Sequence, residues 1–109
     1  MGTIIFKPVD SDATTGTSLV GEIHTTFDTL AKIFGAPNLS PEGDKTRAVW
    51  RLQFSCGTVA TIYDWKNDTL PRGPYLWHVG GKNHHALALV AKCLVPDQHV
   101  VPQNIKAIA

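Results

Sequence analysis

Two alternating segments around Cys56-Gly57 constrain the fold more than any other feature of this sequence. Between residues 48 and 55, apolar side chains occupy every second position, namely Ala48, Trp50, Leu52 and Phe54. Residues 58–65 resume a β-rich pattern after the glycine turn. A period of two places the apolar side chains on one face of a strand. Two such runs around a glycine turn predict an antiparallel hairpin.

Patterns on either side of the hairpin predict three more strands and two helices. Residues 3–7 and 18–25 predict two strands before the hairpin, and residues 75–79 predict one after it. Apolar residues three and four positions apart between Phe27 and Phe34 predict a helix over residues 26–34, with Gly35 as its C-cap. Asn83 is placed to cap a second helix, which is apolar almost all round and extends to about Leu94.

The predicted order β-β-α-β-β-β-α indicates an α+β fold. We expect an antiparallel sheet of four to five strands with two helices packed on one face. A length of 109 residues suits a single domain over residues 1–109. Pro96 and Pro102 interrupt the C-terminal segment, so residues 95–109 are predicted to form a partly irregular tail.

Charge and cysteine content exclude several classes of function. Ten Lys and Arg residues against nine Asp and Glu residues give a net charge of +1, whereas proteins that bind long nucleic acid usually carry a larger basic excess. No apolar run reaches the roughly 18 residues of a membrane-spanning helix, and the N-terminus lacks the pattern of a signal peptide. We therefore expect a cytoplasmic protein with no membrane partner. Cys56 and Cys93 are too few for a disulfide framework and are predicted to be free thiols.

Residues 63–85 concentrate the side chains that suit a small anionic ligand. Aromatic rings stack on bases, and lysine and arginine neutralise phosphates. A Gly-Gly pair at the start of a helix lets backbone N–H groups approach an anion. The predicted ligand-binding residues are Trp65, Lys66, Arg72, Tyr75, Trp77, His78, Gly80, Gly81, Lys82, Asn83 and His84. No catalytic residue, metal ligand or cofactor is predicted.

Other interpretations compete for the same segment. Tryptophan side chains also suit a core, because aromatic residues dominate core burial; this applies to Trp50, Trp65 and Trp77. Gly80-Gly81 also suits a plain turn between strand and helix. The adjacent histidines His84 and His85 point about 100° apart on a helix and so do not form a metal-ligand pair.

An enzyme is a further alternative. Asp64 and Lys66, together with Glu22, loosely resemble the carboxylates and lysine of a metal-dependent phosphodiesterase. The sequence favours a turn aspartate and a solvated lysine instead. No serine lies in a Gly-x-Ser-x-Gly elbow, and no residue near Cys56 in the sequence is specified as its base.

Three motifs resemble small proteins encoded in tailed-phage genomes. They are GTVATIYDWK at residues 57–66, WHVGG at residues 77–81 and FGAP at residues 34–37, and the resemblance covers about residues 18–90. Phage proteins of this size include the anti-defence sponges, which sequester the nucleotide signals of bacterial immunity without cleaving them. The chain looks similar to that functional class in context and ligand chemistry. The resemblance implies immune evasion in the cytoplasm of the host cell.

Three functional hypotheses follow. The first is non-catalytic sequestration of a small anionic nucleotide-like signalling molecule by a homo-oligomer, because a small domain alone encloses a ligand poorly. Apolar tail residues would supply subunit contacts, namely Val100, Val101, Ile105 and Ile108. The second is a protein–protein interaction module, such as an inhibitor of a host enzyme, with the aromatic residues as a hot spot. The third is a metal-dependent nucleotide phosphodiesterase.

Overall fold

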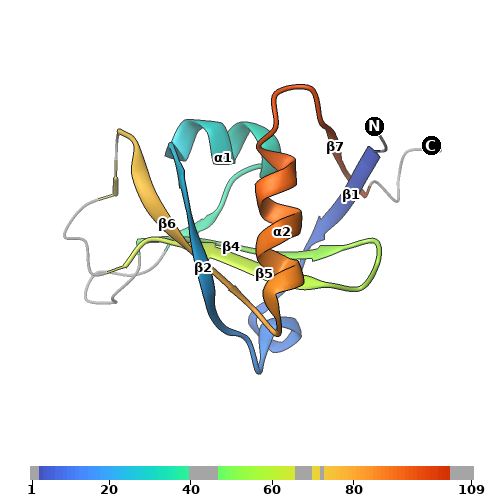
Figure 1. The fold of residues 1–109 in the computed structure, drawn as a ribbon. Helices are drawn as coiled ribbons and strands as arrows, with labels where there is room; N and C mark the ends of the chain where they lie inside the picture. Colours follow the sequence, from blue (N-terminus) through green and yellow to red (C-terminus); the bar gives the residue numbers. More distant parts are fainter. Residues whose placement is uncertain (1–2, 40–46, 66–69, 72, 104–109) are drawn as a thin grey trace.

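The computed structural model describes residues 3–39, 47–65, 70–71 and 73–103 (Figure 1). In chain order the elements are β1 (Thr3–Pro8), the 3-10 helix η1 (Ser11–Thr14), β2 (Ser18–Thr25), α1 (Phe27–Phe34), β3 (Asn38–Leu39), β4 (Ala48–Phe54), β5 (Val59–Tyr63), β6 (Tyr75–Gly81), α2 (His84–Cys93) and β7 (His99–Pro102). The predicted α+β class is confirmed. So are the strand at residues 18–25, the hairpin of β4 and β5, and both helices.

The sheet is larger than predicted and is mixed rather than purely antiparallel. Its seven strands follow the order β2-β6-β5-β4-β1-β7, with β3 paired to β4. β1 and β7 form a parallel pair, and the other pairs are antiparallel. The expectation of four to five antiparallel strands was therefore wrong. The added strands β3 and β7 have two and four residues, which is too short for a pattern of alternation to be visible.

The C-terminal segment contributes one of these strands. Val100 and Val101 lie opposite Ile4 and Ile5 in the parallel register of β7 and β1, and the Gln103 N–H donates a hydrogen bond to the Phe6 carbonyl. Within the tail that was predicted to be partly irregular, residues 99–102 are therefore a strand. Both valines are half-buried on this edge strand. Ile105 and Ile108 lie outside the described residues.

Local capping explains where the helices begin. The Thr26 hydroxyl accepts a hydrogen bond from the Thr29 N–H at the start of α1, and Gly35 ends this helix with a φ of 87°. At the start of α2, the Asn83 side chain accepts a hydrogen bond from the His85 N–H over 2.9 Å. These bonds satisfy donors that a helix leaves without partners in its first turn.

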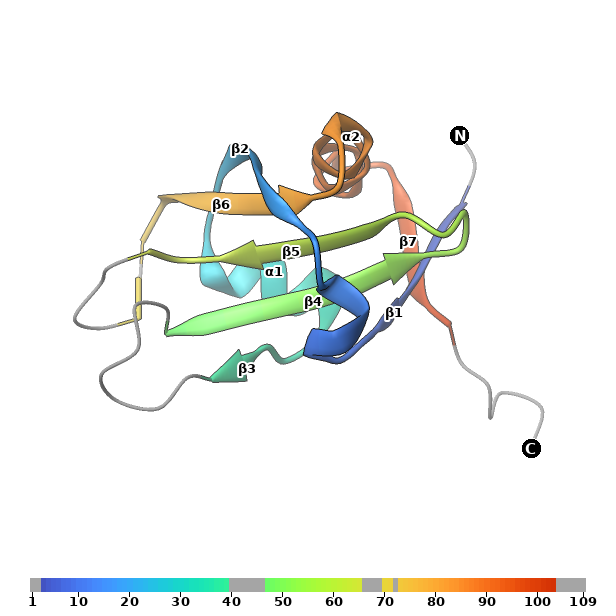
Figure 2. The ribbon, with the colours of Figure 1, turned by 90° about the horizontal axis from the view of Figure 1, so that it is seen from below.

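Both helices pack on the same face of the sheet and share one core with it (Figure 2). Phe34 of α1 contacts Phe6 with ring centroids 5.2 Å apart, and Trp50 and Trp77 pack edge to face at 5.5 Å. The Trp50 indole N–H donates a hydrogen bond to the Gly35 carbonyl over 2.8 Å. α1 therefore packs on the alternating apolar residues of β4.

Candidate functional site

β6 divides the predicted ligand-binding residues between two faces of the sheet. Trp77 and Val79 point into the core, whereas Leu76 and His78 point to the opposite, outer face. Lys82 and Asn83 follow at the far end of the strand and are exposed. The segment that looked like one site in the sequence therefore forms two separate features.

Trp77 does not belong to either feature. Its side chain is 0% exposed and is surrounded by aromatic rings of the core. No face of this indole is open for a ligand to stack on, so its predicted role in ligand binding is corrected to a role in the core. The Trp77 indole nitrogen is buried without a hydrogen-bond partner.

Gly80 and Gly81 serve packing rather than anion binding. The two residues were expected to end the strand and present backbone N–H groups to a ligand. Instead they pair with β5 and β2 on either side as part of β6. A Cβ on Gly81 would overlap the Ala86 methyl group, and one on Gly80 would overlap the Thr61 hydroxyl. Gly81 therefore allows α2 to lie close against the sheet.

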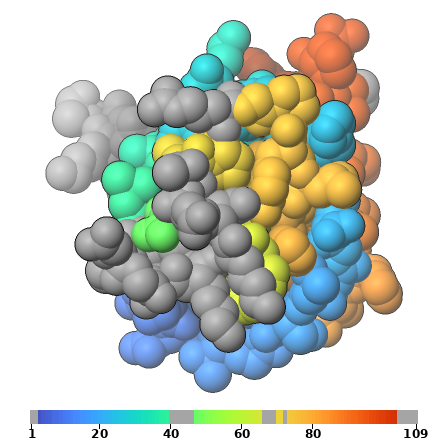
Figure 3. Space-filling view, turned by 90° about the vertical axis from the view of Figure 1, so that its left-hand side faces the viewer, coloured from blue at the N-terminus to red at the C-terminus, as the bar shows by residue number. Residues whose placement is uncertain are grey.

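An aromatic patch occupies the outer face where β5, β6 and β2 meet. We call it the outer-face patch and define it as Glu22, Tyr63, Trp65, Leu76 and His78. The Tyr63 and His78 rings stack with centroids 5.4 Å apart and an interplanar angle of 16°. The Trp65 ring lies 6.3 Å from His78 and is 40% exposed. Figure 3 shows this end of the molecule, where β6 in gold lies beside β2 in blue.

Polar groups border the rings of the outer-face patch. His78 Nε2 lies 3.7 Å from Glu22 Oε2, and the Glu22 side chain is 47% exposed. The other ring nitrogen, His78 Nδ1, is buried and has no hydrogen-bond partner. Partial burial raises the pKa of Tyr63, so this phenol stays protonated at neutral pH and can donate a hydrogen bond. The patch thus offers flat apolar faces next to one acceptor and one donor.

Tyr75 positions the patch rather than forming part of its surface. Its ring packs edge to face against buried Trp77 with centroids 5.3 Å apart. Its hydroxyl accepts a hydrogen bond from the Trp65 N–H over 3.1 Å and lies 3.4 Å from the Trp65 carbonyl. The Tyr75 phenol therefore fixes the backbone that carries the exposed indole.

Asp64 also has a structural role. Its carboxylate is 0% exposed, and Oδ1 accepts hydrogen bonds from the Arg47 and Ala48 N–H groups over 2.7 and 3.0 Å. Glu22 lies on the outer face instead. The two carboxylates that the phosphodiesterase interpretation requires are therefore not brought together.

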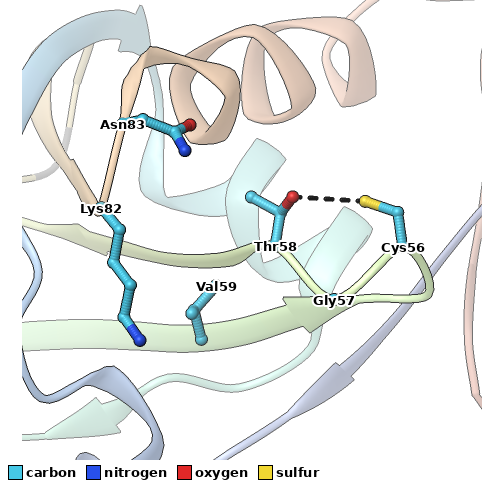
Figure 4. A pocket seen from close by; sticks show the side chains of 6 residues that line it. All are labelled: Cys56, Gly57, Thr58, Val59, Lys82 and Asn83. Atoms are coloured by element: carbon cyan, nitrogen blue, oxygen red, sulfur yellow. Dashed lines mark hydrogen bonds between the residues drawn. The ribbon is translucent and has the colours of Figure 1, made fainter.

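A hollow lies between the β4–β5 turn and the β6–α2 turn (Figure 4). We call it the turn hollow. It has a volume of about 300 Å³ and is lined by Cys56, Gly57, Thr58, Val59, Lys82 and Asn83. The Lys82 side chain extends toward Val59, and Asn83 stands at the start of α2. Asn83 uses Oδ1 for capping, which leaves its amide nitrogen as a donor to the hollow.

The two cysteines are free thiols in contrasting environments. Cys56 is exposed at the rim of the turn hollow, and its sulfur lies 3.3 Å from the Thr58 hydroxyl. A hydrogen bond with this side chain lowers the pKa of the Cys56 thiol. Cys93 is the last residue of α2, and its burial raises the pKa of its thiol to about 12.

His84, one of the predicted residues, contributes to neither feature. His84 is exposed in the first turn of α2 and does not line the turn hollow. Lys66 and Arg72 lie outside the described residues. Within the ranges that the structure describes, no group of three or more histidine, cysteine or acidic side chains is placed to hold a metal ion. Nor is any helix there long and apolar enough to span a membrane.

Sequence analysis missed three members of the patch as binding residues. Glu22 is far from residues 63–85 in the chain, and only the β2–β6 register brings it opposite His78. Tyr63 and Leu76 lie within the predicted segment, and alternation with Ile62 and Trp77 would have placed both on the outer face.

Comparisons with family models, with curated proteins and with solved structures return no match.

Proposed function

We propose that the protein binds and sequesters a small anionic, nucleotide-like signalling molecule without cleaving it. One observation carries this proposal: the Lys82 side chain and Asn83, the N-cap of α2, line the same cavity of about 300 Å³. An ammonium group neutralises phosphate, and the dipole of a helix favours negative charge at its N-terminus. The volume lies at the lower end of the range for small-molecule pockets.

The outer-face patch supports a nucleotide in particular. His78 and Lys82 are four positions apart along one strand direction, which corresponds to roughly 13 Å. A ligand could place its phosphate in the turn hollow and its base against Trp65. Stacking on an aromatic side chain contributes about 1–3 kcal/mol per base. Sequestration requires affinity alone, so no catalytic group is assigned.

The resemblance to small tailed-phage proteins supports a role in immune evasion in the host cytoplasm. We also propose that the protein acts as a homo-oligomer, because each feature is open to solvent on one protomer. Light scattering coupled to size-exclusion chromatography measures this directly. If the protein is a monomer and still binds nucleotide, the proposed oligomer is contradicted, but the proposed sequestration is not.

The experiment for sequestration is the release of bound small molecules by heat, followed by mass spectrometry. The protein is first incubated with extract from bacteria whose nucleotide-signalling immunity has been triggered. Recovery of an intact nucleotide near one equivalent per site is the expected result. A cleaved product shows catalysis instead, and an empty release from folded protein overturns the proposal.

Charge reversal in the turn hollow provides a sharper test. Lys82→Glu should weaken nucleotide binding at least tenfold, because it replaces attraction for phosphate with repulsion at the helix N-terminus. Lys7→Glu is the matched control, since Lys7 is exposed on β1 and does not line the hollow. Equal affinities for the two variants remove the hollow from the proposed site.

A protein–protein interaction module is a second candidate, favoured by the exposed apolar surface of the patch. Trp65 is 40% exposed and Leu76 is 51% exposed, and tryptophan is enriched among interface hot spots. A pull-down from host lysate should then capture one protein in stoichiometric amount. Leu76→Glu should abolish that capture.

A further inference from the structure

The outer-face patch carries a hydrogen-bond acceptor, the Glu22 carboxylate, beside its aromatic rings. Glu22 lies opposite His78 in the β2–β6 register, and its carboxylate is 47% exposed beside the imidazole. β2 is an edge strand, so this side chain is reached from solvent without movement of the sheet. An ionised carboxylate accepts hydrogen bonds and donates none.

This carboxylate orients an anionic ligand on the surface. Negative charge at Glu22 repels phosphate, whereas Lys82 attracts it at the other end of β6. The roughly 13 Å between Lys82 and His78, the residue that Glu22 faces, exceeds the Debye length of about 8 Å at physiological ionic strength. Each charge therefore acts mainly on the part of the ligand next to it, and the base is the part that meets Glu22.

We propose that the patch selects bases that carry an exocyclic amino group, with Glu22 as the specificity-determining residue. This inference rests on the proposed function. An amino group donates to the carboxylate. Uracil instead places a carbonyl oxygen, which the carboxylate repels, where cytosine has its amino group, and hypoxanthine has only a C–H where guanine has its amino group. Tyr63 stacks on the His78 imidazole and holds it beside Glu22. The exposed Trp65 ring supplies the face on which the base stacks.

Calorimetric titration of the full chain with matched nucleotides tests this selection. Guanosine and inosine monophosphates differ by one amino group, and cytidine and uridine monophosphates differ by an amino group against a carbonyl. We expect the amino member of each pair to bind about tenfold more tightly, as for a hydrogen bond to a charged group. Ligand binding should also quench the fluorescence of Trp65, since Trp50 and Trp77 are buried.

Two variants connect the preference to its residue. Glu22→Ala should reduce the tenfold preference to less than threefold while inosine and uridine monophosphates bind no more weakly. Asp97→Ala is the matched control, because it removes one exposed negative charge in the turn after α2 and should keep the preference.

The outcomes separate this inference from the proposed function. Equal binding within each pair, or a preference that survives Glu22→Ala, overturns base selection and leaves sequestration standing. If none of the four nucleotides binds, while the heat-release experiment yields an intact nucleotide, selection by the patch is again overturned. An empty heat release removes the proposed function itself. Tighter binding of N-acetylarginine amide than of any nucleotide would show that the patch takes a cationic side chain instead.

Discussion

Replacement of Gly81 by alanine tests whether this glycine serves packing or ligand binding. A Cβ at this position overlaps the Ala86 methyl group and lies 3.3 Å from the Asn83 carbonyl oxygen. A methyl group and a backbone oxygen cannot rotate away, so α2 must shift on the sheet. Overpacking of this kind costs about 1–3 kcal/mol, against a gain of about 0.4–1 kcal/mol from the less flexible unfolded chain. We expect a net loss of roughly 1–2 kcal/mol in the free energy of unfolding.

Urea denaturation followed by tryptophan fluorescence measures this loss as a lower midpoint at an unchanged m-value. The double variant Gly81→Ala/Ala86→Gly removes the overlap and should show a coupling energy of about 1 kcal/mol. Gly73→Ala is the matched control, since a Cβ at Gly73 meets nothing within 4 Å. If Gly81→Ala is as stable as Gly73→Ala but binds nucleotide more weakly, the packing explanation is refuted and the anion-binding one returns.

Three further predictions concern buried and exposed groups. Asp64→Ala should lower the free energy of unfolding by about 2–4 kcal/mol in the same urea assay, because it leaves the Arg47 and Ala48 N–H groups without their acceptor; a loss below 0.5 kcal/mol contradicts this role. A thiol reagent should modify one cysteine per native chain and two in denaturant, since Cys56 is exposed and Cys93 is buried. The pKa of Cys93 is raised from 9.0 to about 12, so above pH 9 the unfolded state loses a proton that the folded state keeps. As the pH rises above 9, the free energy of unfolding should therefore fall by up to about 1.4 kcal/mol per pH unit. Cys93→Ala should reduce this slope.

The sequence predicted those parts of the fold that rest on local patterns. Alternation located β4 and β5, apolar spacing located α1, and Asn83 located the start of α2. The parallel pairing of β7 with β1 depends on contacts between the two ends of the chain. A four-residue strand after Pro96 shows no periodicity, so this pairing could not be predicted from the residues alone.

The candidate site was predicted as a region but not as a surface. Composition singled out residues 63–85, and the structure brings Tyr63, Trp65 and His78 of this segment together. Successive side chains along β6 point to opposite faces of the sheet. Trp77 therefore points inward and His78 points outward. The contribution of Glu22 depends on strand order, because β2 pairs with β6 rather than with the strand that follows it in the chain.

The placement of Trp65 argues for a functional surface at the outer-face patch. An indole that is 40% exposed gains only part of the free energy that burial would give. A residue of this kind in an unconstrained loop would be free to rotate, yet the Tyr75 hydroxyl contacts both the N–H and the carbonyl of Trp65. The same Tyr75 ring is anchored against the buried Trp77. The core therefore fixes the backbone that carries the exposed indole, which would lower the entropy lost on binding of the proposed ligand.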